Sequence, residues 1–459
     1  MLLCAGSQAD ARPGAGLAGS WIGTYTLTGP GQVALVAGGG RVAVALGVGH
    51  ADLQTVPSKI DGAHIRFQLP GRPAPLAFEA RLTNGGLVGT VRQGPAHGTF
   101  RARRGSAPGM VARGLYARAA SVQAVVDDPY GPARLVDLQS GAVHGLYPAG
   151  ASFLIGSGFA TRDPVGGTAR FDAAGAHLAG KPVPRRRLRQ LEVRFRSGDA
   201  MLSGTLTLPL GTGRHPAVAF VHGSGPTERA YLPELHALLV RNGVAVLAYD
   251  KRGIGQSGGF YPGESPTDGA IDVLARDAAA AARFLRSQPE IDPVRVGLAG
   301  HSQAGWIAPL AASREPAIRF LVVFSGPAVT ADENDLYQDL AGEGEQPAEL
   351  TDAEIDAQVT ARGRSGVDPI PWIRRLRIPA LWVYGGRDRH VPPRLSERRL
   401  EPIAREPGRD FTVVDFPKAN HALVETTTGL TAEMLRSDTF APGMFARVGD
   451  WLRAHHLAG

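Results

Sequence analysis

The stretch "GLAGHSQAGWIAP" (residues 297–309) places Ser302 among small residues at the end of an apolar run. A helix-forming segment follows from Gln303. A strand that turns sharply into a helix through such a serine has the form of a nucleophile elbow. A serine that only caps the helix would give a similar stretch. The choice between the two depends on whether the chain also offers a base, an acid and an oxyanion hole.

The small residues around Ser302 suit a tight turn, because backbone segments approach one another closely there. The elbow is usually G-x-S-x-G. In this chain Gly300 occupies the first glycine position, and Ala304 stands where the second glycine is usual, followed by Gly305. Alanine is small enough for the turn, so the stretch still predicts an elbow.

The sequence around Ser302 belongs to a region in which strands and helices alternate. From residue 191, apolar runs such as "PAVAFVHG", "VAVLAYD", "VRVGLAG", "IRFLVVFSG", "IPALWVYGG" and "FTVVDFP" are separated by helix-length segments. This alternation predicts a mostly parallel sheet with helices on both faces. Functional residues of such sheets lie at the carboxyl ends of the strands.

A serine hydroxyl becomes a good nucleophile when an imidazole accepts its proton. Thirteen histidines compete for this role. We predict His421, which follows the last apolar run in a loop at the carboxyl edge. His301 is adjacent to Ser302 on a tight turn, so its side chain is expected to point away from the serine. We interpret His390 as a residue at the rim.

The imidazole needs a carboxylate to hold its tautomer and stabilise the imidazolium. Asp388 follows the penultimate apolar run in "WVYGGRDRHVP" and preserves the chain order serine, aspartate, histidine. An aspartate after Gly-Gly-Arg could also be a simple turn former. Its place in the order favours the catalytic interpretation.

An oxyanion needs preorganised N–H donors. The Gln303 amide, next to Ser302 at a helix N-terminus, is one candidate. The loop "FVHGSGPTE" supplies the second, for which we predict the Ser224 amide, with Gly225 as the neighbouring possibility. Gly223 and Gly225 leave this backbone free to approach a ligand, and His222 is expected to brace the loop.

Five motifs carry a resemblance to a known family: "VHGSGPTE", "LAYDKRGIGQSGG", "GHSQAGW", "YGGRDRHVP" and "NHAL". The last ~270 residues resemble α/β-hydrolases, specifically bacterial carboxylesterases and lysophospholipase-like proteins with an N-terminal β region. "SWIGTY" and "LVGTVRQG" resemble the β module of the same proteins. The resemblance implies Ser302, Asp388 and His421 as a catalytic triad and Ser224 and Gln303 as oxyanion donors.

The remaining sequence predicts the domain organisation. Residues 20–105 alternate apolar and polar positions in short runs, which indicates an antiparallel β barrel or sandwich. Residues 106–190 continue in β style and end in "AGKPVPRRRLRQ", predicted to be a solvated Pro- and Arg-rich linker. Residues 191–459 form the α/β-hydrolase domain, with a short helical cap at about 327–370. The acidic segment there could equally be a solvated pair of surface helices.

The composition excludes several classes of function. Of the 459 residues, 43% are hydrophobic and 20% charged, and the formal net charge is +7. The basic residues are scattered apart from "RRRLR" (185–189), so no nucleic-acid partner is expected. Without an H-E-x-x-H motif or paired Cys/His spacing, we expect no metal and no cofactor. The oligomeric state stays undetermined.

The N-terminus bears on location. "MLLCAGSQADA" resembles the end of a secretory or lipoprotein signal, but a positive n-region and a full apolar segment are missing. Residues 1–19 therefore leave two locations open: periplasmic or secreted if they are a signal remnant, and cytoplasmic otherwise. No apolar run approaches the ~18 residues of a membrane span.

The predicted activity is hydrolysis of a small-molecule carboxylic ester through an acyl-enzyme. A serine peptidase or aminopeptidase, acting on an amide, and a thioesterase could use the same residues. The acidic segment 332–345 keeps the aminopeptidase open, because a free amine is usually bound by carboxylates. A non-catalytic binding protein is the alternative from another class, and a complete triad argues against it.

Overall fold

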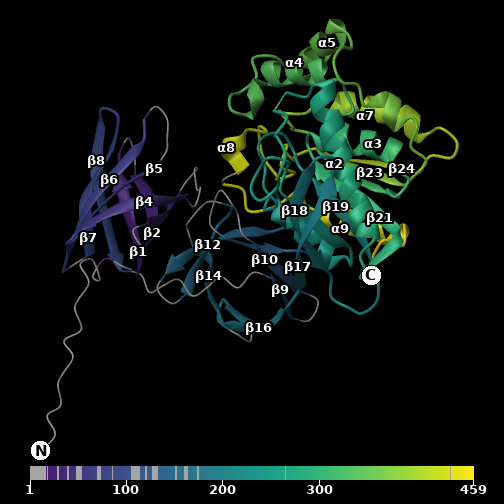
Figure 1. Cartoon of the computed structure of the whole chain (residues 1–459). Helices are drawn as coiled ribbons and strands as arrows, with labels where there is room; N and C mark the ends of the chain where they lie inside the picture. Colours follow the sequence, from purple (N-terminus) through teal and green to yellow (C-terminus); the bar gives the residue numbers. More distant parts are fainter. Residues whose placement is uncertain are drawn as a thin grey trace, which may run out of the picture.

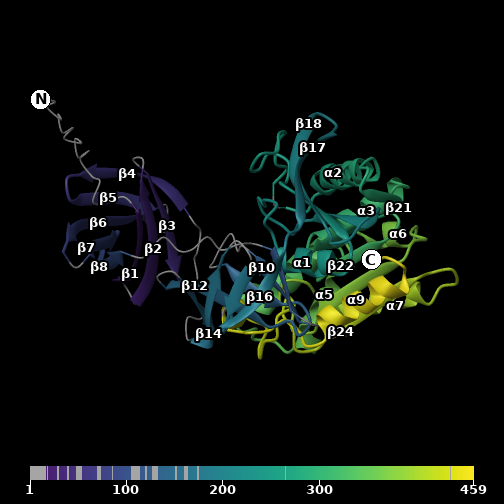
Figure 2. The same cartoon turned by 90° about the horizontal axis from the view of Figure 1, so that it is seen from below.

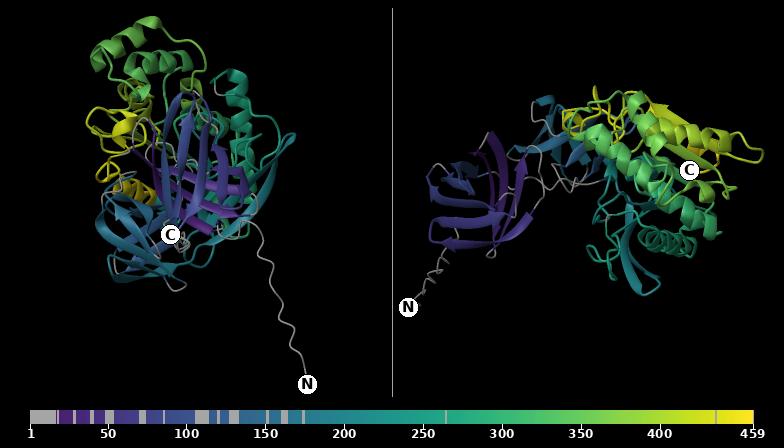
Figure 3. Two further views of the ribbon diagram at one scale, coloured as in Figure 1. Left: turned by 90° about the vertical axis from the view of Figure 1, so that its left-hand side faces the viewer. Right: turned by 90° about the horizontal axis from the view of Figure 1, so that it is seen from above.

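The computed structural model shows three parts along the chain, two β barrels and an α/β domain (Figures 1 and 2). Figure 3 shows the same parts from two more sides. The structure describes residues 17, 19–27, 30–38, 41–47, 54–69, 74–84, 86–104, 114–118, 121–126, 133–149, 152–159, 164–172, 175–263, 265–434 and 436–458. The signal-like segment at the N-terminus, up to residue 16, lies outside the described residues.

The first barrel is closed by eight strands in chain order. They are β1 (Gly19–Thr26), β2 (Pro30–Gly38), β3 (Arg41–Gly47), β4 (Gln54–Asp61), β5 (His64–Leu69), β6 (Leu76–Thr83), β7 (Gly86–Gln93) and β8 (Ala96–Arg104). Strand β1 pairs antiparallel with β8 and closes the barrel. Buried and exposed side chains alternate strictly along β5, so one face fills the interior and the other meets solvent.

The second barrel also has eight strands. They are β9 (Gly114–Arg118), β10 (Ser121–Val126), β11 (Arg134–Asp137), β12 (Val143–Ala149), β13 (Ser152–Gly156), β14 (Pro164–Phe171), β15 (Gly175–Leu178) and β16 (Lys181–Arg186). Strand β16 occupies half of the tract that the sequence predicted to be a linker. That prediction is wrong for residues 181–186.

The prolines of β16 explain how a Pro-rich tract enters a barrel. Pro182 and Pro184 pair with β15, whereas pairing with β9 occurs at Arg185 and Arg186. Proline cannot donate to a ladder and is tolerated where a strand has a neighbour on one side only. The prolines lie in that part of β16, so the closure of the barrel loses no hydrogen bond to them.

The second barrel packs against the α/β domain through its outer face. Ala124 and Val126 of β10 belong to a core shared with that domain, while Val125 between them points into the barrel's own core. Phe159 meets Phe440 of the α/β domain edge to face, with ring centroids 5.5 Å apart. This barrel therefore buries apolar side chains on both faces.

The α/β domain is built on one eight-stranded sheet in the order β17-β18-β20-β19-β21-β22-β23-β24. Its strands are β17 (Arg189–Ser197), β18 (Ala200–Leu208), β19 (His215–Val221), β20 (Ala245–Tyr249), β21 (Ile291–His301), β22 (Leu321–Phe324), β23 (Ala380–Gly385) and β24 (Phe411–Phe416). Strand β18 runs antiparallel to both neighbours. The other six strands, β20, β19, β21, β22, β23 and β24 in sheet order, are parallel to one another. All carboxyl ends of these six strands therefore meet at one edge.

Helices cover both faces of this sheet. They are α1 (Pro233–Arg241), α2 (Asp268–Arg286), α3 (Ala304–Arg314), α4 (Ala331–Ala341), α5 (Asp352–Arg362), α6 (Ile370–Ile373), α7 (Pro393–Ala404), α8 (Thr431–Met434) and α9 (Met444–Ala454), with a 3-10 turn η1 (Gly342–Gly344) after α4. Helices α2, α3, α6 and α7 share one core, and α1 and α9 share the other with the second barrel. The described helices include none long and apolar enough to cross a membrane.

The segment between β22 and β23 holds α4, η1 and α5. Helix α4 starts at a capping box in which Thr330 and Glu333 bond each other's backbone, and Thr351 and Glu354 repeat it for α5. Each box satisfies two amides that a helix start leaves free. Both helices are thus specified locally although their exposed faces are acidic.

Candidate active site

Ser302 lies on a sharp turn between β21 and α3. Its φ of 56° is in the left-handed region, which costs free energy for a residue with a side chain. The turn leaves no room beside it, because a Cβ on Gly300 would lie 2.6 Å from the Ala304 Cβ and 2.6 Å from the Val221 carbonyl oxygen. Glycine is therefore required at 300, and the methyl group of Ala304 uses the space that this glycine leaves.

His421 and Asp388 meet at the same edge of the sheet. The two residues follow β24 and β23, and the His421 Nδ1 lies 2.7 Å from the Asp388 Oδ2. Because a carboxylate oxygen accepts, Nδ1 carries the hydrogen and Nε2 keeps its lone pair. In the part of the chain that the structure describes, no hydrogen bond joins His421 to the Ser302 hydroxyl.

The Asp388 carboxylate is buried, and both of its oxygens accept hydrogen bonds. Its side chain is 0% exposed. Its Oδ1 accepts from the amides of His390 and Val391 at 2.7 and 2.8 Å. The Tyr337 hydroxyl of α4 donates to the Asp388 carbonyl at 2.6 Å. Burial raises the pKa of the Asp388 carboxyl to about 6 and lowers the pKa of His421. At neutral pH the pair is thus a carboxylate beside a neutral imidazole.

His301 holds the backbone of His421. Its Nε2 lies 2.8 Å from the His421 carbonyl oxygen, which can only accept, so Nε2 carries the hydrogen. Its Nδ1 therefore accepts from the Tyr231 hydroxyl at 2.7 Å. Burial lowers the pKa of His301 to about 3, which keeps the ring neutral in this relay. His301 supports the loop that carries His421.

The predicted oxyanion donors are free. Among the described residues, the amides of Ser224 and Gln303 donate to no acceptor, and the Gly225 amide is equally free. A Cβ on Gly223 would lie 2.5 Å from the Tyr231 hydroxyl and 3.3 Å from the Ser302 Cβ. The loop after β19 therefore approaches Ser302 closely, and Gly223 permits that approach.

Lys251 links the loop after β19 to the turn that carries Ser302. Its side chain is buried, and its ammonium donates to the carbonyl oxygens of Gly223 at 2.6 Å and Gly225 at 2.9 Å. The Gln303 side-chain oxygen lies 3.4 Å from the same nitrogen. One cation thus holds the loop after β19 and the residue after Ser302. This role was not predicted from the sequence, although Lys251 lies inside the motif "LAYDKRGIGQSGG" quoted above.

The loop around Lys251 is itself fixed by a partly buried ion pair. Both carboxylate oxygens of Asp250 accept from the Arg229 guanidinium, at 3.0 and 2.7 Å, and one also accepts from the Gln256 amide at 2.9 Å. His222, expected to brace this region, packs against Tyr249 with ring centroids 5.0 Å apart. Burial lowers the pKa of His222 to about 3, so its ring is neutral.

His390 lies beside His421, with ring centroids 4.9 Å apart. It also lies against the segment between β22 and β23, because a Cβ on Gly344 would be 2.8 Å from its Nε2. Burial lowers the pKa of His390 to about 4, while nearby carboxylates, including Glu343 and Glu345, oppose this shift. His390 is neutral at neutral pH.

Known proteins resemble the α/β domain. Residues 213–345 match the family model described as serine aminopeptidase, S33. The esterase EstD of Thermotoga maritima is 28% identical over 251 residues, which cover 49% of this chain and 58% of EstD. The thiohydrolase aneE of Aspergillus aculeatus is 33% identical over 132 residues, covering 28% of this chain and 40% of the relative. This chain spans less than two thirds of the length of either curated relative.

A solved structure is also similar to part of this chain. An esterase of Pyrococcus furiosus superposes with a TM-score of 0.42 at 21% identity, covering 58% of this chain and 91% of that structure.

The strand order and the turn at Ser302 define an α/β-hydrolase domain. With the family match over residues 213–345 and the similarity to EstD, they support an α/β-hydrolase, esterase-like protein.

Proposed function

We propose that the protein hydrolyses carboxylic esters with Ser302 as nucleophile, His421 as general base and Asp388 as the acid that orients it. The observation that carries this proposal is the 2.7 Å contact between the His421 Nδ1 and the Asp388 Oδ2, at the sheet edge where Ser302 stands on a left-handed turn. A helix-capping serine needs neither a strained backbone nor a buried imidazole–carboxylate pair nearby. The nucleophile interpretation accounts for both.

The protonation states suit a two-step acyl transfer. The neutral imidazole of His421 takes the proton of Ser302 as its oxygen attacks the ester carbonyl carbon. The same proton passes to the alkoxide leaving group, which departs as the alcohol. Water then attacks the acyl-enzyme carbonyl and gives its proton to His421. The bond to Ser302 breaks, and the serine oxygen recovers that proton while the acid leaves.

The negative charge of each tetrahedral intermediate would be stabilised by the free amides of Ser224 and Gln303. Lys251 supports this proposal, because it binds the carbonyl on each side of Ser224. A loop held in this way needs little reorganisation when charge develops. We propose that Lys251 is a positioning residue for the oxyanion hole.

The segment 327–370 would act as the cap over the substrate. Its α4 reaches the site through Tyr337, and η1 approaches His390. The exposed carboxylates of Glu343 and Glu345 favour a higher pKa of His390. A substrate with a free amine could use them, which keeps an aminopeptidase as the second candidate, in line with the description of the matching family.

The test is hydrolysis of p-nitrophenyl esters from acetate to palmitate by the wild type, Ser302→Ala and Ser325→Ala. Ser325 is the matched control, because it follows the neighbouring strand β22 with a φ of 47°. We expect Ser302→Ala to lose about 10⁴-fold or more in kcat and Ser325→Ala to retain activity. Cleavage of aminoacyl p-nitroanilides or acyl thioesters in preference to all esters would instead favour the peptidase or the thioesterase.

A further inference from the structure

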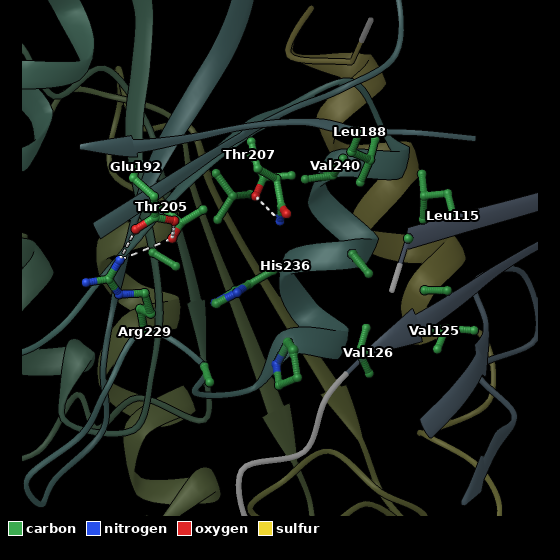
Figure 4. Close-up of a pocket in the computed structure, with 18 residues that line it drawn as sticks. Leu115, Val125, Val126, Leu188, Glu192, Thr205, Thr207, Arg229, His236 and Val240 are labelled. Carbon is green, nitrogen blue, oxygen red and sulfur yellow. Dashed lines mark hydrogen bonds and ion pairs between the residues drawn. The ribbon is translucent and has the colours of Figure 1, made fainter. Parts of the chain in front are cut away.

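A cavity of about 290 Å³ lies between the second barrel and the α/β domain (Figure 4). Its floor is one face of β17, β18 and β20, with Gln190 paired to Thr207 across the first two strands. Helix α1 and strands β9 and β10 form its walls. The residues that line it include none of Ser302, Asp388 and His421. The cavity is therefore separate from the proposed active site.

The two walls are apolar. Leu115 and Val126 come from the barrel, and Ala237 and Val240 come from α1. All four side chains are buried in the core shared by the two parts. Walls of this kind favour a hydrocarbon body.

The charges in the lining cancel one another. Arg229 forms a two-point ion pair with Asp250 behind the wall and a second pair with Glu192 at 2.7 Å. Figure 4 shows Arg229, Glu192 and Thr205 gathered at one end of the cavity. Two carboxylates thus satisfy this guanidinium. An anionic ligand would therefore find no free cation among the described residues of the lining and would face Glu192.

Neutral hydrogen-bonding groups remain on the floor and on α1. The Thr207 hydroxyl oxygen accepts from the side-chain amide of Gln190 at 3.2 Å. The hydroxyl hydrogen of Thr207 is therefore left to donate. Burial lowers the pKa of the His236 ring to about 3, and its Nε2 has no partner among the described residues. The His236 ring extends from α1 into the space between the helix and the strands (Figure 4). A hydroxyl both donates and accepts, so it can pair with these groups in either tautomer of the imidazole.

We infer that this cavity binds an uncharged alcohol with an apolar body of about ten carbon atoms. The volume of about 290 Å³ is about twice that of a cavity that takes benzene, which suits a fused pair of rings. The site needs the barrel wall as well as α1. This inference assigns a role to the second barrel and does not depend on catalysis at Ser302.

The experiment is calorimetric titration of the full chain with 2-naphthol, which is uncharged at pH 7, and with 2-naphthoate as the anionic counterpart. We expect one equivalent of 2-naphthol to bind, and 2-naphthoate to bind at least about tenfold more weakly. Ala237→Phe fills the cavity from α1 and should weaken 2-naphthol binding by at least about tenfold. Ala357→Phe, on the exposed face of α5, should bind like the wild type.

Two further variants keep the test decisive. Val126→Phe fills the cavity from the barrel wall and serves if Ala237→Phe does not fold. Ser302→Ala should bind 2-naphthol unchanged, whether or not the protein hydrolyses esters. Wild-type affinity in both cavity-filling variants, or equal binding of 2-naphthoate, would overturn the inference. Loss of 2-naphthol binding in Ser302→Ala would overturn it too, because it would place the ligand in the active site.

Discussion

The first barrel and the carboxyl edge of the central sheet differ in what they bury. In the barrel, every buried side chain that the structure describes is apolar, including Trp21 and Phe78. At the sheet edge, Asp388, Lys251 and His301 are buried as well. Burying a charge costs free energy unless it is paired and hydrogen-bonded. The difference teaches that packing explains the barrel, whereas the polar groups at the edge need a chemical reason.

After Ser302→Ala, the largest expected effect is that of Asp388→Asn. The backbone amides of His390 and Val391 require an acceptor at the Oδ1 position. The asparagine therefore turns its NH2 group toward the His421 Nδ1, and the imidazole is held in the wrong tautomer. We expect kcat to fall by about 10⁴-fold, with the fold retained. Steady-state hydrolysis of the best p-nitrophenyl ester measures this. Activity within tenfold of the wild type would show that Asp388 does not orient the base.

In the first barrel, a substitution is expected to lower stability and to leave catalysis unchanged. Phe78 is 2% exposed and stacks on Phe67 with ring centroids 4.9 Å apart. Phe78→Ala should lower the free energy of unfolding of this barrel by about 3–5 kcal/mol and leave kcat unchanged. Denaturant unfolding together with the ester assay measures both. Val88→Ala, at a side chain 43% exposed, is the control. A parallel loss of kcat in Phe78→Ala would remove the contrast between the two regions.

Lys251→Met tests the positioning role at the edge. Methionine keeps the apolar stem and removes the donors to Gly223 and Gly225, so the loop with Ser224 loses its anchor. We expect kcat to fall about a hundredfold, the size of the loss of one oxyanion donor, with little change in KM. Lys418→Met, at a lysine side chain 72% exposed, should behave like the wild type. An unchanged kcat in Lys251→Met would assign this lysine a purely structural role.

The smallest effect is the pH dependence. Burial raises the pKa of the Asp388 carboxyl to about 6, so this group is charged above about pH 6 and becomes neutral below it. A neutral acid no longer stabilises the imidazolium of His421. We expect kcat/KM to fall about tenfold per pH unit on the acid side of this value. A profile that stays flat down to about pH 4 would contradict the assigned role of the pair.

The sequence was sufficient for the elements that depend on local pattern and chain order. Alternating apolar runs predicted the sheet, and the ends of consecutive parallel strands brought Asp388 and His421 together. Ser302 and the amides of Ser224 and Gln303 were predicted from turn chemistry, from the order of the candidate base and acid along the chain, and from the resemblance to a known family. Their catalytic roles stay predictions until they are measured.

The parts that sequence reasoning missed depend on pairings between distant segments. Lys251 contacts Gly223 because β20 lies beside β19, and a strand order cannot be read from apolar runs. The prolines in residues 181–186 predict a linker, yet they lie in the part of β16 that pairs with β15 and not with β9. Tyr231 reaches the site through its hydrogen bond to the side chain of His301.

The most direct test of the central claim is covalent labelling with a fluorophosphonate, mapped by peptide mass spectrometry on the wild type and on Ser302→Ala. The account predicts a single adduct on the peptide that contains Ser302, absent from the variant and still present in Ser325→Ala. An adduct on another residue, or no adduct on the folded wild type, would contradict the assignment of Ser302 as the nucleophile.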